Sequence, residues 1–271
     1  EQVPGLADLA AAATEALATT PSAMLELTRL VASRFGLRLA IADCGASQAM
    51  VVHASQEQGG ARVTPYDRPL LDMPVSEGQM GAMHQALEAA LASCVDPGFS
   101  ADLVVGCGAL ARCSHWSEPA LTILNGIQPA GVVQLALDNG AVVTQIAAIA
   151  RSFPDIACRI FEQDGLLGLG AAVCPRGTSK PGSKAVEVRW RVDAAEEERR
   201  DVKCGELVRI PLPPGQKASL ALYPAKHVDI GLSRPGVAAT ASIDGGRVGL
   251  MVDAREVADK AVRQPWEEAL T

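Results

Sequence analysis

The stretch LRLAIADCGAS occupies residues 37–47, AMVVHAS occupies 49–55 and ARVTPY occupies 61–66. The three segments are apolar or β-branched and are separated by short turns, which predicts successive antiparallel strands over 38–43, 49–55 and 61–66. The first strand ends in Asp43, and Gly45, Ala46 and Ser47 follow it. A backbone that turns on small residues can approach a phosphate closely, because no bulky side chain intervenes. We therefore expect a carboxylate and a phosphate-sized turn at one end of this meander.

Helical and strand patterns alternate on both sides of the meander. Helical spacing of apolar residues predicts helices over 6–18, 22–35, 78–94, 118–127, 142–152 and 155–163. Short apolar runs predict buried strands over 101–106 and 131–137. A meander followed by strand–helix units predicts an α/β lobe with a mixed sheet that is antiparallel on one side.

The pattern changes after residue 175. The segment PRGTSKPGS at 175–183 is rich in turn-forming residues, as is typical of a domain boundary. Strand patterns then follow at 185–192, 206–211, 218–223, 237–243 and 247–253. The charged run at 194–201 is expected to be a solvated loop between strands. We expect a lobe over 1–174, a small all-β barrel or sandwich over 175–255 and an acidic tail over 256–271.

Composition narrows the functional classes. The chain has 271 residues, 48% of them hydrophobic, and a formal net charge of −7. This charge argues against nucleic-acid or anionic membrane partners, and no run approaches the roughly 20 apolar residues of a membrane-spanning helix. Seven cysteines, some in strand-like runs such as 105–107 and 172–174, show no secreted disulfide pattern, so we expect a cytoplasmic protein. The chain opens on Glu-Gln-Val-Pro-Gly without Met, and we expect it to be part of a longer protein.

Two turns resemble nucleotide-binding loops of the actin-like ATPase superfamily, which includes sugar kinases, Hsp70 and actin. DCGAS at 43–47 resembles the second phosphate loop, and VVGCGAL at 104–110 resembles the adenosine loop. Within that superfamily the chain resembles the glutamate mutase L-type proteins over residues 36–255. The segments that carry this resemblance are 101–110, 124–132, 164–175, 210–216, 229–232 and 245–255.

The resemblance implies an actin-like, ribonuclease H-like lobe with a following β domain. It also implies a chaperone- or reactivator-like protein whose partner is an adenosylcobalamin-dependent mutase, with ATP and Mg²⁺ as ligands. Asp43 would then orient water or the metal. The residues that would line the phosphates are Gly45, Ala46 and Ser47, and those that would lie against the nucleoside are Gly106, Gly108 and Ala109.

Departures from the family pattern leave a second interpretation open. Gln48 stands where the family has Thr, and Cys44 and Cys107 replace the usual residues. The first phosphate loop and the first lobe are missing, so this chain carries half of a nucleotide clamp. We expect weak ATP binding and at most a weak ATPase that needs the missing lobe. The alternative is a degenerate, non-hydrolysing scaffold, and a sugar or acetate kinase ranks last because no catalytic base is recognisable.

Simpler interpretations exist for the individual residues. Asp43 can form an Asx turn at the end of its strand, and Gly106-Cys107-Gly108 can be a tight turn without a ligand. Cys107, Cys113 and His115 do not have a usual zinc spacing and lack a fourth ligand, so no metal site is expected from them.

Overall fold

The computed structural model describes residues 20–45, 48–57, 60–69, 87–94, 99–163 and 165–255. The helices in these ranges are α2 (Thr20–Phe35), a helical stretch at 87–92, the short 3₁₀ helix η1 (Ala109–Arg112), α4 (Ser117–Ile127), α5 (Val142–Ile149) and α6 (Pro154–Gln163). None of these helices is long and apolar enough to cross a membrane. The helix expected at 6–18, most of the one expected at 78–94 and the tail at 256–271 lie outside the described ranges.

The strands of the lobe are β1 (Leu39–Cys44), β2 (Gln48–Glu57), β3 (Gly60–Pro69), β4 (Leu103–Gly108), β5 (Gly131–Asp138) and β6 (Leu166–Cys174). Those that follow are β7 (Arg176–Gly177), β8 (Lys184–Val192), β9 (Glu198–Lys203), β10 (Leu207–Ile210), β11 (Lys217–Pro224), β12 (Val228–Asp229), β13 (Ala239–Asp244) and β14 (Gly249–Asp253). Among the described residues they form an eight-stranded sheet in the order β10-β14-β6-β5-β4-β1-β2-β3, a four-stranded sheet in the order β13-β11-β8-β9 and a two-stranded sheet of β12 and β7.

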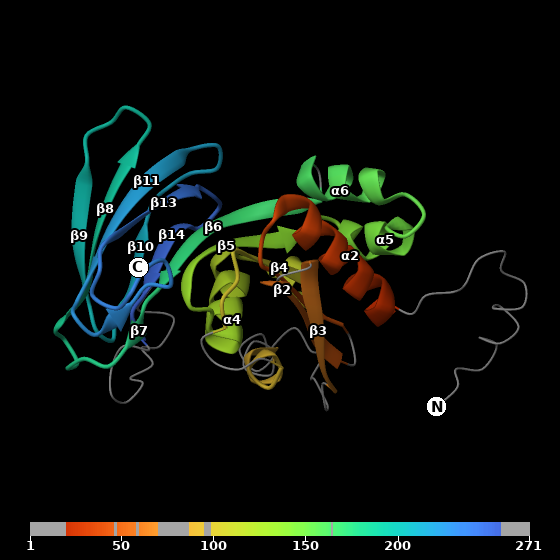
Figure 1. Cartoon of the computed structure of the whole chain (residues 1–271), viewed down its shortest axis with the longest axis horizontal. Helices are drawn as coiled ribbons and strands as arrows, with labels where there is room; N and C mark the ends of the chain where they lie inside the picture. The colour runs from red at the N-terminus through yellow and green to blue at the C-terminus, as the bar shows by residue number, and fades with distance from the viewer. Residues whose placement is uncertain are drawn as a thin grey trace, which may run out of the picture.

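The large sheet is mixed and has helices on both faces in its lobe part (Figure 1). Strands β1, β4 and β5 run parallel, whereas β2 is antiparallel to both β1 and β3, and β6 is antiparallel to β5. One face carries α2, α5 and α6, which pack side chains such as Leu27 and Phe161 against Leu39 and Ile41. The other face carries α4 and the stretch at 87–92. The expected α/β lobe with a mixed sheet, followed by β structure, is confirmed.

The β strands beyond residue 175 are divided between the two larger sheets. β14 pairs parallel with β6, and β10 pairs with β14, so both extend the large sheet. The four-stranded sheet packs on this extension through Val173 of β6, Val188 of β8 and Leu220 of β11. The sandwich therefore shares its inner layer with the lobe, because β6 buries side chains on both of its faces.

Two local expectations need correction. The charged run at 194–201 is not all loop, since β9 begins at Glu198 and pairs along β8 as an exposed edge strand. Its charged side chains suit such an edge, because they discourage pairing with other chains. β4 extends to Gly108 rather than ending at Gly106, so Gly106 lies inside a strand and not in a turn.

Segments that resembled a family on sequence meet at the junction of lobe and β structure. A Cβ on Gly231 would lie 2.8 Å from Cα of Gly131, so the segments 229–232 and 124–132 touch through their backbones. A Cβ on Gly246 would collide with the backbone of Leu169 and Gly170, which joins 245–255 to 164–175 in the same way. The glycines in these segments are therefore explained by close backbone packing.

Candidate functional site

The strand order of the lobe reverses between β1 and β4. From β1 the chain moves outward through β2 and β3, and then returns to place β4 and β5 on the other side of β1. In open α/β sheets, such a switch point forms a crevice outside the carboxyl ends of the strands, where ligands bind. The carboxyl ends of β1, β4 and β5 bear Asp43, Gly108 and Asp138. We take this edge of the sheet as the candidate site.

Asp43 is half-buried at the end of β1, beside Cys107 of β4. Burial raises the pKa of the Asp43 carboxyl above its usual value of 3.8, and the nearby carboxylate of Asp138 raises it further. Burial penalises the ionised form, and a second negative charge adds repulsion. A cation between these two groups would relieve both effects.

Asp138 is a site residue that the sequence did not reveal. It is 3% exposed, and its Oδ1 accepts a hydrogen bond of 3.0 Å from the backbone N–H of Val143 in the first turn of α5. Burial raises the pKa of Asp138, although backbone hydrogen bonds from Val143 and Val142 partly offset the rise. Asp138 directly follows the apolar run at 131–137, and its position at the end of a buried strand was the available signal.

Gly108 closes the crevice beside Asp43. Its φ is 66°, in the left-handed region that favours glycine. A Cβ at this position would collide with the carbonyl oxygen of Cys44 and would lie 2.9 Å from Oδ1 of Asp43. Only a residue without a side chain therefore lets η1 begin this close to the end of β1.

The other predicted site residues divide into three groups. Gly45 is half-buried just beyond β1, and Ala109 is half-buried at the start of η1. Gly106 is buried, and a Cβ there would lie 3.0 Å from Leu137 and 3.2 Å from both Ile123 and Leu110. It faces the core rather than the crevice. Ala46 and Ser47 lie outside the described residues.

The thiols around the site are protonated. Burial raises the pKa of Cys44 and of Cys107, and the carboxylate of Asp43 raises both further. Cys113 donates a hydrogen bond of 3.7 Å to the carbonyl of Ala109, and burial raises its pKa to about 11. Reactive cysteines are found as thiolates in electropositive surroundings, and these are not. Within the described residues, no three His, Cys, Asp or Glu side chains are placed to hold a metal ion.

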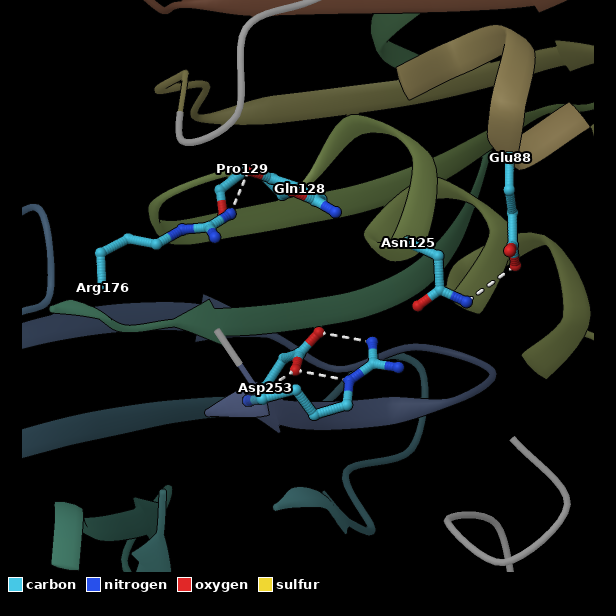
Figure 2. A network of polar contacts seen from close by, with 7 residues as sticks. Glu88, Asn125, Gln128, Pro129, Arg176 and Asp253 are labelled. Carbon is cyan, nitrogen blue, oxygen red and sulfur yellow. Dashed lines mark hydrogen bonds and ion pairs between the residues drawn. The ribbon is translucent and has the colours of Figure 1, made fainter. Parts of the chain in front are cut away.

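A second polar region lies at the far end of α4 (Figure 2). The guanidinium of Arg176 donates to the carbonyls of Gln128 and Pro129, the latter at 3.1 Å, and so ties β7 to the end of α4. Nearby, Asn125 donates a 2.7 Å hydrogen bond to the carboxylate of Glu88. These contacts hold the helix end against its neighbours.

Asp253 and Arg255 form a buried pair in the same region (Figure 2). Nε and Nη2 of Arg255 donate to the two carboxylate oxygens at 2.8 and 2.7 Å, and the side chains are 8% (Asp253) and 7% (Arg255) exposed. The adjoining cavity measures about 10 Å³, which is room for about one water molecule. This region is structural, because the charges satisfy each other and no ligand fits.

No protein-family model and no curated protein matches the chain. The chain is similar in structure to the type II variant of the Ppx/GppA phosphatase of Aquifex aeolicus, with 13% identity. The match covers 49% of this chain and 43% of the phosphatase, at a TM-score of 0.21. This similarity is distant and identifies neither a family nor an activity. The fold therefore stands on the strand order itself.

Proposed function

We propose that the chain is one lobe of a nucleotide clamp, and that its switch-point edge binds the magnesium-bound phosphates of ATP. The observation that carries the proposal is the convergence of Asp43, Gly108 and Asp138 where the strand order reverses. Gly108 keeps the carboxyl ends of β1 and β4 close together, because the carbonyl of Cys44 takes the place that its Cβ would need. The two carboxylates supply the negative charge for a cation.

Magnesium suits this pair of carboxylates. Mg²⁺ keeps several of its waters and is commonly held by one or two carboxylates together with substrate phosphates. Its charge would stabilise the ionised forms of Asp43 and Asp138, whose pKa values are raised by burial. In this proposal Asp43 also orients the attacking water when the partner lobe closes, which is why hydrolysis by this chain alone should be weak.

The biological role that we propose is that of a cytoplasmic chaperone or reactivator for an adenosylcobalamin-dependent mutase. Its support is the sequence resemblance to the glutamate mutase L-type proteins in the lobe and in the β strands. Four of those segments, 124–132 with 229–232 and 164–175 with 245–255, meet in pairs at the junction of the lobe and the β sandwich. In this proposal a movement of the lobe is transmitted to the sandwich through these contacts.

The alternative is a scaffold that has lost nucleotide binding. One observation favours it, namely that Gly106, which the resemblance assigns to the nucleoside, is covered by Leu110, Ile123 and Leu137.

Calorimetric titration of the full-length protein with MgATP separates the two proposals. We expect measurable binding that Asp43→Asn weakens at least ~10-fold, since a lost charge–metal contact is worth about 1.4 kcal/mol or more. Asp244→Asn is the matched control, because this carboxylate lies on the exposed β13 with its side chain 63% exposed. Binding that Asp43→Asn leaves unchanged, or no heat together with no co-purifying mutase, would exclude the clamp and favour the scaffold.

A further inference from the structure

Trp116 and Arg247 form an exposed aromatic–cation pair that the proposed phosphate site does not use. The side chain of Trp116 precedes α4 and is 40% exposed. The guanidinium carbon of Arg247, from the segment before β14, lies 5.9 Å from the centroid of the Trp116 ring. The pair places an aromatic face and a cation side by side at the surface.

The short segment after Gly108 carries Trp116. Gly108 leads directly into η1, and Cys113 returns to bond the carbonyl of Ala109 at the start of that helix. The three residues from Cys113 to Trp116 span at most about 10 Å. Trp116 is therefore held close to the glycine that closes the proposed phosphate site.

Arg247 reaches the same end of the sheet from the other side. Its backbone N–H donates a 3.1 Å hydrogen bond to the carbonyl of Gly168 on β6. Gly168 pairs with Ala136 of β5, two residues before Asp138. Two segments far apart in sequence thus bring a tryptophan and an arginine beside the carboxyl edge where the phosphates are proposed to lie.

We infer that Trp116 and Arg247 form a stacking platform for the base of a nucleotide, whose phosphates occupy the Asp43–Gly108–Asp138 edge. This inference rests on the proposed function. Stacking of a base on an aromatic ring contributes about 1–3 kcal/mol and tolerates different bases, because every base has a π face. Arg247 would hold the ring in place by the cation–π contact while the base stacks on its exposed surface.

The simpler explanation is that Arg247 only fastens the β13–β14 connection to α4. A fastening contact would contribute to stability and would be indifferent to the base of a ligand. The two explanations therefore differ in whether Trp116 distinguishes a nucleotide from its phosphates alone.

The test compares MgATP with magnesium tripolyphosphate on the full chain, by calorimetry, for wild type and for Trp116→Ala. We expect Trp116→Ala to weaken MgATP binding about 10-fold and to leave tripolyphosphate binding unchanged. Trp116→Phe should restore most of the MgATP affinity. Tyr223→Ala is the control, because Tyr223 carries a similar arginine contact, with Arg189 at 4.6 Å, on the four-stranded sheet.

The outcomes separate the inference from the function on which it rests. Suppose that both ligands bind, and that Trp116→Ala either lowers both affinities equally or changes neither of them. The Trp116–Arg247 pair is then a structural contact, and the stacking inference is overturned while the phosphate site stands. If wild type binds neither ligand, the proposed function fails and the platform with it. A circular dichroism melt of each variant shows whether a lost affinity reflects unfolding.

Discussion

At the scale of single residues, the candidate site depends on side chains that are costly to the fold. Asp43 and Asp138 are carboxylates whose burial disfavours their ionised forms. Gly108 is confined to a left-handed conformation with no room for a side chain. Such local costs are typical of binding sites, where stability is given up for a ligand.

Gly108→Ala should destabilise the protein by at least ~2 kcal/mol, because it adds left-handed strain to a collision with the carbonyl of Cys44. Gly36→Ala is the matched control, since Gly36 has a φ of 65° and nothing within 4 Å of its would-be Cβ. That control should cost about 1 kcal/mol. Urea unfolding of both variants measures the difference, and equal losses would contradict the proposed crowding at Gly108.

Asp43→Asn should stabilise the ligand-free protein at neutral pH. The pKa of Asp43 is raised in the folded state, so the folded protein binds the proton more tightly than the unfolded chain, and stability falls as the pH rises through this window. The substitution removes that penalty. The gain in melting temperature over wild type should shrink as the pH is lowered towards 3.8, the usual value. A variant less stable than wild type at pH 7 would contradict this reasoning.

At the scale of elements, the site is positioned by the parallel pairing of β1 with β4. Their starting ends are tied by Asp102, which accepts hydrogen bonds from the backbone N–H of Arg38 at 2.7 Å and from its guanidinium at 2.5 and 3.2 Å. Register fixed at this end sets Asp43 opposite Cys107 at the other. An ion pair away from the site thus helps to place its residues.

Asp102→Asn should cost about 1 kcal/mol at pH 7, because the pair is partly exposed and its charge is screened. Burial raises the pKa of Asp102, but the hydrogen bonds from Arg38 outweigh burial and hold it below 3.8. Its stabilisation is therefore present above pH 3.8 and lost as the pH falls through the folded-state pKa. Asp244→Asn, on an exposed pair, should change stability by less than ~0.5 kcal/mol. Thermal melts across this pH range provide the measurement.

The sequence predicts many of the helices and strands of the lobe. The meander, the apolar strand before Gly108, and α4, α5 and α6 were predicted within a few residues, because helical and alternating patterns are local properties. Strand β9 was missed because its exposed edge has no apolar alternation. Asp138 was missed because nothing local shows that its strand lies two places from β1.

At the scale of the whole molecule, the lobe and the β structure share a sheet. β6 contributes Ala172 to the core under α4 and Val173 to the core of the sandwich. β6 lies between β5 and β14, and β14 comes from beyond residue 175. The boundary that composition marks at 175–183 is therefore crossed by hydrogen bonds and by packing.

Truncation after Cys174 should leave the lobe without β14 and with the sandwich face of β6 exposed. An uncovered apolar edge strand favours aggregation. We expect residues 1–174 to be aggregated in size-exclusion chromatography and to melt without the cooperative transition of the full chain. A monodisperse fragment with a sharp melt would show that the lobe is independent.

The sequence by itself determined most of the helices and strands, although not β6 or β9, and it determined the small-residue turn after Asp43 and the resemblance on which the nucleotide clamp is proposed. Only the tertiary structure decided that Asp138 joins Asp43 across β4, that Gly106 is covered by core side chains while Gly108 packs against the end of β1, and that β14 extends the lobe's sheet. The physical reason is the distance along the chain over which each kind of interaction acts. Periodicity and turn chemistry act over a few residues, whereas parallel pairing brings together strand ends that are separated by up to about a hundred residues and whose meeting no local pattern records.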